Sequence, residues 1–219
     1  MSIAVERLIL GDLETNCWIV SDGAGGPLIV IDPAGDAEDA ARLIEAVDDR
    51  EVSVIVLTHG HFDHLGSVKP LVEVTAAPIA VHEADADRIT DAAPAGTGGA
   101  LFGYEHVSPP ADRILHQGDR IVAGRLTLEV LHTPGHTQGS ISLLAEDPGG
   151  GSPHLFSGDT LFSGSVGRTD FPGGDARALS RSIAERIAPL SDDTIVHPGH
   201  GPDTTIGRER RINPFFPRA

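Results

Sequence analysis

The stretch Thr58-His-Gly-His-Phe-Asp-His64 places three histidines and an aspartate within six consecutive residues. The apolar run Val52-Ser-Val-Ile-Val-Leu57 comes directly before it, and this short, β-branched run predicts a buried strand. Side chains in a loop that leads from such a strand into a helix, here from Gly66 onward, can converge on one point. Imidazole nitrogens and carboxylate oxygens together suit Zn²⁺, Fe or Mn²⁺. The chain has only 11 histidines, so chance clustering is the weaker explanation, and the stretch predicts a metal site.

Composition limits the classes of function. The 219 residues fit one domain with its own core. The net charge of −16 disfavours nucleic acid as a partner, because phosphate binding depends on clustered lysine and arginine. No apolar stretch approaches the about 20 residues that cross a bilayer, and the N-terminus lacks the order of a secretory signal, so no membrane partner is expected. The single cysteine, Cys17, excludes an internal disulfide and favours a cytoplasmic location.

Apolar periodicity predicts two comparable sets of strands and helices, over about 1–90 and 111–212. The expected strands are 3–10, 16–21, 28–31, 52–57, 78–81, 113–115, 120–122, 126–131, 139–145, 154–157 and 194–196. The expected helices are 36–47, 66–75, 83–90, 175–187 and 206–212. Two mixed sheets packed face to face with helices outside would bury every apolar face, so we expect an α/β (α+β) fold in one domain, 1–219. Residues 91–110 lose periodicity and predict a surface loop, either a lid over the site or irregular covering.

Three further places repeat the order of strand, glycine-containing turn, and histidine or aspartate. His136 follows the strand 126–131 in His-Thr-Pro-Gly-His-Thr, and Asp159 follows the strand 154–157 in Ser-Gly-Asp-Thr. His200 follows the strand 194–196 in His-Pro-Gly-His-Gly. Because ligands from several strand ends can meet at one edge, this repetition strengthens the prediction of a metal site.

These ordered motifs resemble the signature of the metallo-β-lactamase superfamily. The flanking stretches Thr15–Trp18, Ile31–Pro33, Phe162–Gly174 and Gly207–Phe215 are similar to its glyoxalase II-like branch, the hydroxyacylglutathione hydrolases, in the short bacterial form. The resemblance covers nearly the whole chain. It implies the four-layer αβ/βα sandwich of that superfamily, in agreement with the two-sheet prediction.

The resemblance also implies a ligand set for two divalent ions, with Zn²⁺ as first choice and Fe or Mn as alternatives. His59, His61 and His136 would hold one ion, and Asp63, His64 and His200 the other. Asp159 would bridge them. A water held between the ions would become the hydroxide nucleophile, and Asp63 would orient it. A thiolate leaving group, whose conjugate acid has a pKa of about 8.5, needs no strong general acid.

Ligand histidines need partners that fix their orientation. Asp32 matches the first motif of the superfamily and is expected to brace the first histidine loop. Arg168 and Asp170 follow Asp159 in Gly-Arg-Thr-Asp, where Arg168 either holds the loop or meets a substrate carboxylate. The remaining histidines are predicted to be surface or packed residues: His82, His106, His116, His132, His154 and His197. Cys17 is predicted to be a packed thiol.

The expected function is hydrolysis of a small thioester, such as a 2-hydroxyacyl conjugate of glutathione or of another low-molecular-weight thiol. Only 19 residues follow His200, so no C-terminal helical substrate domain is expected, and glutathione is one carrier among several. The alternative is a persulfide dioxygenase with one iron on His59, His136 and Asp159. Filled ligand positions disfavour a non-catalytic binding module, the charge disfavours RNA cleavage, and the flanking motifs disfavour β-lactam hydrolysis.

Overall fold

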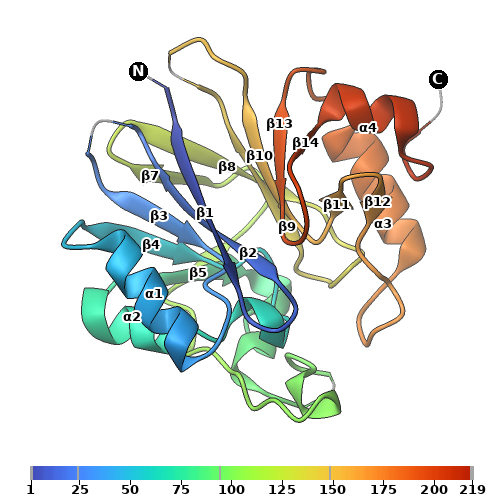
Figure 1. Ribbon diagram of the computed structural model, residues 1–219. Helices are drawn as coiled ribbons and strands as arrows, with labels where there is room; N and C mark the ends of the chain where they lie inside the picture. Colours follow the sequence, from blue (N-terminus) through green and yellow to red (C-terminus); the bar gives the residue numbers. More distant parts are fainter. Residues whose placement is uncertain (1, 24, 94, 148, 218–219) are drawn as a thin grey trace.

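Two six-stranded mixed sheets form the centre of the computed structural model, which describes residues 2–23, 25–93, 95–147 and 149–217 (Figure 1). The first sheet has the order β1 (Ala4–Leu10), β2 (Thr15–Ser21), β3 (Leu28–Ile31), β4 (Val52–Val56), β5 (Ile79–His82) and β6 (Arg113–Leu115). The second has the order β14 (Thr204–Thr205), β13 (Ile195–Pro198), β10 (His154–Gly158), β9 (Ile141–Ala145), β8 (Leu126–His132) and β7 (Arg120–Ala123). A hairpin of β11 (Leu161–Phe162) and β12 (Ser165–Val166) follows β10.

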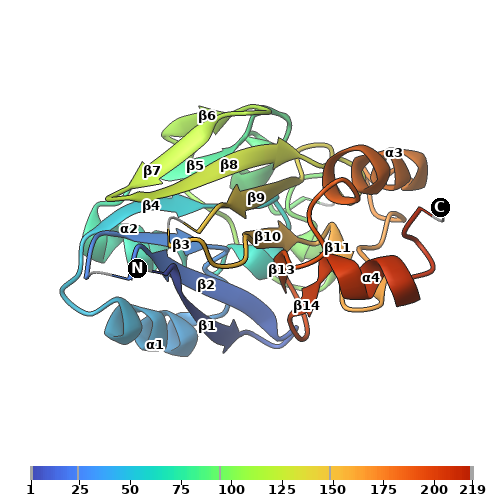
Figure 2. The same ribbon diagram turned by 90° about the horizontal axis from the view of Figure 1, so that it is seen from above.

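Helices cover the two outer faces. The helices α1 (Ala37–Val47) and α2 (Val68–Thr75) lie against the first sheet, and α3 (Ala176–Ser182) and α4 (Ile206–Ile212) lie against the second. Figure 2 shows both sheets between these two helical layers. The predicted four-layer sandwich with two mixed sheets and helices outside is therefore confirmed.

The strand β3 shows why both faces of the first sheet are buried. Its side chains alternate: Ile29 and Ile31 point into the core between the sheets, where Phe156 of the second sheet also lies. Leu28 and Val30 belong to the core beneath α1 and α2. A strand buried on both faces carries an unbroken apolar run, and Leu-Ile-Val-Ile is such a run.

Aspartate side chains cap the N-termini of α1 and α3. The carboxylate of Asp36 accepts hydrogen bonds from the backbone N–H groups of Glu38 and Asp39, and that of Asp175 accepts from Arg177 and Ala178. The last turns of the helix predicted over 175–187 are π-helical, from Ile183 to Ile187. None of the helices in the described ranges has the length and apolar character of a bilayer span.

Two local predictions need correction. Residues 83–90, predicted as one short helix, form two 3₁₀ turns, Glu83–Asp85 and Arg88–Thr90. The strands β11, β12 and β14 have no counterpart among the predicted strands, because two residues are too few to show an alternating pattern.

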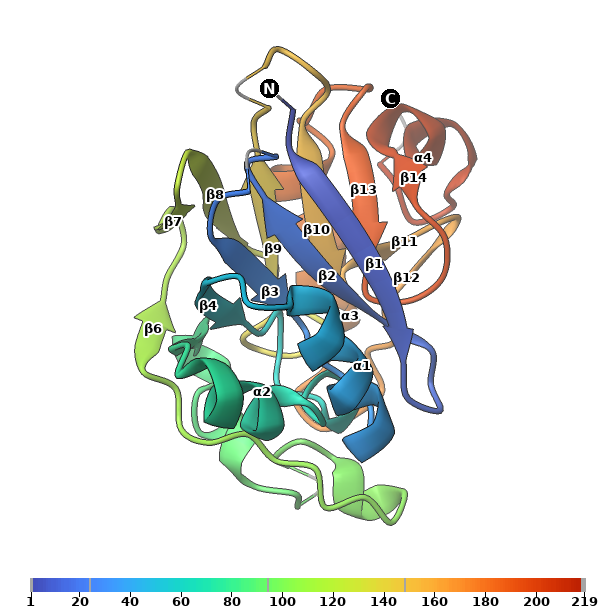
Figure 3. The same ribbon diagram turned by 60° about the vertical axis from the view of Figure 1, so that its left-hand side comes forward.

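The loop predicted over 91–110, described for 91–93 and 95–110, lies at the same end of the molecule as the β1–β2 turn (green and dark blue in Figure 3). It includes a 3₁₀ turn, Gly99–Leu101, and is tied to the histidine loop by a 3.1 Å hydrogen bond from the Phe62 N–H to the Thr97 carbonyl. The Tyr104 hydroxyl donates to the Asp12 carboxylate at 2.7 Å. The segment is thus packed against the end of the sandwich where β4 stops.

Candidate metal centre

Four loops meet at one end of the sandwich, and each follows the carboxyl end of a strand. His59, His61, Asp63 and His64 follow β4 in the first sheet, the last two in the 3₁₀ turn Phe62–His64. In the second sheet, the loops after β8, β10 and β13 carry His136, Asp159 and His200 respectively.

Glycines make the approach of these loops possible. Gly135 has a φ of +142°, and a Cβ there would lie 2.3 Å from the backbone nitrogen of Leu179, so α3 can pack directly on the turn before His136. A Cβ on Gly199 would lie 2.2 Å from Oδ1 of Asp159. Both turns therefore need glycine for the ligand side chains to reach the centre.

The first cluster consists of His59, His61 and His136, all buried. One side-chain nitrogen from each lies within 4.8 Å of the others. Nδ1 of His61 and Nε2 of His136 are 2.7 Å apart. Three imidazoles converging on one point match the donor set that divalent zinc and iron prefer.

The second cluster consists of Asp63, His64 and His200, whose ligand atoms also lie within 4.8 Å of one another. Nε2 of His64 is 3.5 Å and Nε2 of His200 is 3.3 Å from Oδ2 of Asp63. This cluster therefore offers two imidazole nitrogens and a carboxylate oxygen.

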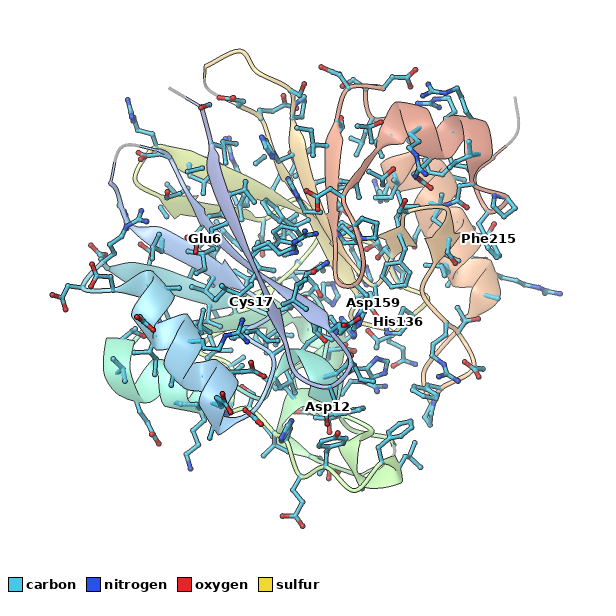
Figure 4. The ribbon with its side chains drawn as sticks, in the orientation of Figure 1. Glu6, Asp12, Cys17, His136, Asp159 and Phe215 are labelled. Atoms are coloured by element: carbon cyan, nitrogen blue, oxygen red, sulfur yellow. The ribbon has the colours of Figure 1, made fainter. Side chains whose placement is uncertain are left out.

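Asp159 lies between the two clusters. Its Oδ2 is 3.5 Å from Nε2 of His136 in the first cluster, and its Oδ1 is 3.5 Å from Nε2 of His64 in the second. Nε2 of His200 is 3.6 Å from Oδ2. Figure 4 shows Asp159 beside His136. One carboxylate thus faces both clusters, as the sequence motifs led us to expect.

Four of the five histidines direct one nitrogen into the centre and bond the other to the surrounding protein. The outer nitrogens contact the Thr58 hydroxyl (His59), Asp32 (His64), the Arg168 carbonyl (His136) and the Leu13 carbonyl (His200), at 2.7–3.1 Å. Such contacts select the tautomer that leaves the inner nitrogen free to bind a metal.

Several of the inner atoms have no partner. Nε2 of His59, Nε2 of His64 and Oδ1 of Asp159 are buried and form no hydrogen bond within the described residues. An unpaired buried polar group costs about 1–3 kcal/mol, so three at one place are unfavourable unless a ligand satisfies them. Divalent cations would satisfy all three, and the residues present fit a metal pair.

Charge is unevenly divided between the clusters. Burial alone would lower the pKa of His64, but the carboxylates of Asp63, Asp32 and Asp159 outweigh it and raise this pKa to about 10. Burial and the neighbouring imidazoles lower the pKa values of His59 and His61. The carboxylates therefore concentrate negative charge around the second cluster, which favours a cation there.

Asp32 contacts the histidine loop at two residues. Its carboxylate accepts hydrogen bonds from the Thr58 N–H at 2.7 Å and the Thr58 hydroxyl at 2.6 Å, and its Oδ2 lies 3.0 Å from Nδ1 of His64. Asp32 is 1% exposed and has a φ of +52°. The structure thus places this carboxylate where it can fix both the loop and a ligand ring.

Arg168 and Asp170 lie at the rim. The Arg168 carbonyl accepts the hydrogen bond from His136, while its exposed side chain makes two 2.7 Å hydrogen bonds to Asp170 and lies 3.7 Å from the centre of the Phe171 ring. Asp170 contacts the Arg168 side chain rather than a ligand. The backbone of Arg168 therefore touches the centre, and the side-chain pair shapes the loop around it.

The sequence motifs gave no indication of Asp85 and Arg88. Asp85 is fully buried and accepts hydrogen bonds from the Gly60 N–H, the Gly139 N–H and the Thr137 hydroxyl at 2.7–2.9 Å. Gly60 lies between two ligand histidines, and Thr137 directly follows a third. Asp85 thus joins the two loops that form the first cluster.

The chain was also compared with known proteins. The family model described as "Metallo-beta-lactamase superfamily" matches residues 10–200. Hydroxyacylglutathione hydrolase GloC of Haemophilus influenzae is 35% identical over 214 residues, which cover 97% of each chain. The B3 metallo-beta-lactamase BLEG-1 superposes with a TM-score of 0.86 at 36% identity, covering 97% of this chain and 99% of that one. TTHA1623, solved in a di-iron-bound form, gives 0.78 at 39% identity, covering 96% and 100%. By sequence and fold, and with candidate metal ligands gathered at one end of the sandwich, the chain belongs to the metallo-β-lactamase superfamily.

Proposed function

We propose that this protein is a binuclear metallohydrolase that cleaves small thioesters, such as a 2-hydroxyacyl conjugate of a low-molecular-weight thiol. The observation that carries the proposal is the position of Asp159, whose two oxygens face two separate clusters of ligand atoms. The full-length similarity to a hydroxyacylglutathione hydrolase supports the choice of substrate class.

When bound, a pair of divalent cations lowers the pKa of a water molecule and polarises the carbonyl group of the substrate. The protein's own residues position the reacting groups. The Asp63 carboxylate, 15% exposed, borders a cavity at the mouth of the centre and can accept a hydrogen bond from the attacking water. The departing thiolate is stable near neutral pH, since thiols have a pKa of about 8.5, so no acid is needed beside it.

We propose zinc as the first metal, with iron and manganese as alternatives. Five imidazoles and two carboxylates suit zinc and iron better than a hard cation such as magnesium. The di-iron form of TTHA1623 supports iron as the second choice. We propose that the protein acts on a small molecule in the cytoplasm, without nucleic acid or a membrane as partner.

One experiment tests reaction and metal together. The purified protein is stripped with a chelator and reloaded with Zn²⁺, Fe²⁺ or Mn²⁺. It is then assayed with a panel of 2-hydroxyacyl thioesters, with glutathione persulfide under an oxygen electrode, and with a chromogenic cephalosporin. Thioester cleavage that chelation abolishes and metal restores is the expected result. Cleavage that survives complete chelation, or turnover of the cephalosporin alone, would reject the proposal.

A persulfide dioxygenase is the second candidate. Asp159 Oδ2 lies 3.5 Å from Nε2 of His136, and the rings of His136 and His59 are 4.7 Å apart, so these three side chains can share a single iron. One iron per chain, with oxygen consumed only when persulfide is added, would favour this candidate over hydrolysis.

A further inference from the structure

We propose that the cavity beside Asp63 receives the thiol carrier of the substrate and selects against anionic carriers, so that cationic carriers bind better than neutral ones and glutathione binds worst. This inference rests on the proposed thioester hydrolysis and adds the chemical class of the carrier.

The cavity has a volume of about 420 Å³ and reaches the second metal cluster at Asp63. Its walls are the turn between β1 and β2, the loop before α1 with the first turn of that helix, and residues 104 and 106. The hydrogen bond from Tyr104 to Asp12 joins two of these walls. A group bound here would lie next to the reacting centre without occupying it, as a thiol carrier must.

Carboxylates dominate the charge of the lining. The lining also includes a basic residue, Arg42, but its guanidinium is already paired with Asp39 at 2.7 Å. Asp63 faces the metal cluster. The carboxylates of Asp12, Glu14 and Asp36 therefore leave an excess of negative charge in the cavity. The five acidic residues of the lining are Asp12, Glu14, Asp36, Asp39 and Asp63. These negative charges repel an anionic carrier and attract a cationic one.

Two further features point to a ligand in this cavity. The rings of Phe62 and Tyr104, both in the lining, stack on each other at 5.1 Å and give the cavity an aromatic wall beside its carboxylates. Thr15 also lines the cavity; it is 1% exposed, and its hydroxyl has no hydrogen-bond partner among the described residues. That buried hydroxyl would gain a partner if a polar atom of the carrier bound at this wall.

Glutathione carries two carboxylates and one ammonium group, and its recognition calls for free basic side chains. The arginines that contact the loops around the centre are already engaged with carboxylates. The pairs are Arg7 with Asp203, Arg42 with Asp39, Arg88 with Asp85 and Arg168 with Asp170. The described part of the site thus lacks the free basic side chains that a carrier with two carboxylates needs.

The test uses three thioesters with the same 2-hydroxyacyl group and different carriers: thiocholine (cationic), N-acetylcysteamine (neutral) and glutathione (anionic). With zinc-loaded protein at low salt, kcat/KM should follow that order, with about tenfold or more between the extremes, and the spread should shrink as salt screens the charges. Non-hydrolysable S-alkyl thioethers of the same carriers, measured by calorimetry, should bind in the same order.

The double variant Asp12→Asn/Glu14→Gln removes two charges and keeps an acceptor for the Tyr104 hydroxyl. It should raise KM for the thiocholine ester and lower it for the glutathione ester by several-fold. The matched control Glu38→Gln/Glu45→Gln removes two charges from exposed positions of α1 outside the cavity and should leave the ratio unchanged.

The outcomes separate this inference from the proposed function. If glutathione is the preferred carrier, or if the double variant and its control change the ratio equally, the cavity does not select by charge. If no thioester is cleaved, hydrolysis is refuted, and the calorimetric order still decides whether the cavity prefers cations.

Discussion

The buried carboxylate of Asp85 lies 3.5 Å from the guanidinium group of Arg88, and this pair connects four loops of the metal centre. Asp85 holds the two histidine loops of the first cluster. Arg88 donates to the Gly96 carbonyl at 2.7 Å and the Pro172 carbonyl at 3.1 Å, in two further loops. The position of the first cluster and of these two loops therefore depends on the same two side chains.

Replacement of Asp85 by Asn should weaken the first cluster. An amide has one acceptor oxygen where Asp85 has two, so at least one buried N–H loses its partner, at about 1–3 kcal/mol of unfolding free energy. Loss of an outer partner typically lowers metal affinity about 10–100-fold, and one zinc should bind correspondingly more weakly. Competition with a chelator measures the affinity, and urea unfolding of the metal-free protein measures the stability.

Asp87→Asn is the matched control, because it removes the same charge from an exposed position two residues away. Both its zinc affinities should equal those of the wild type. Equal zinc affinities in the Asp85→Asn protein would show that Asp85 contributes to folding alone.

Asp32→Asn should spare the backbone and weaken the second cluster. The φ of +52° at Asp32 lies in the left-handed region, which Asn tolerates better than most residues. The amide cannot match the charged contact with His64, so the second zinc should bind about 10–100-fold more weakly. Asp48 also has a positive φ, of +51°, at an exposed position, so Asp48→Asn controls for the replacement of an aspartate by asparagine at a positive φ. A similar loss of affinity in both variants would contradict the assigned contact.

His82 should make the metal-free protein less stable in mild acid. Burial and the stacked ring of His132 lower the pKa of His82 to about 4, whereas an unfolded histidine titrates at about 6.5. Between these values the unfolded state binds more protons, so the free energy of unfolding falls as pH drops from about 6.5 to 4. His82→Asn should reduce this dependence, measured by urea unfolding of chelated protein at several pH values. Identical pH profiles for the two proteins would refute the assignment.

Much of the fold and the convergence of the candidate ligands could be predicted because the information is local. Apolar runs such as Val52–Leu57 mark strands, and the ligands follow them within a few residues. The sandwich arrangement then requires these strand ends to meet. The place of Asp32 beside the histidine loop was implied by its match to the first motif of the superfamily, and Asp32 directly follows β3.

The remaining features depend on contacts between distant residues. In the sequence, Asp85 resembles an ordinary solvent-exposed acid within a predicted helix. It is buried because it accepts hydrogen bonds from residues 60, 137 and 139. The acidic cavity likewise combines single residues from four separate segments of the chain, which no periodic pattern connects. Such features become visible only when the loops are placed in space.

The most direct test of the metal pair is the number of zinc ions bound per chain. Elemental analysis after chelation, reloading and buffer exchange should give two for the wild type and fewer for Asp159→Asn, because one carboxylate faces both clusters. A matched Asp87→Asn protein should still bind two. One zinc per chain in the fully loaded wild type, or two bound with unchanged affinity by Asp159→Asn, would contradict the account.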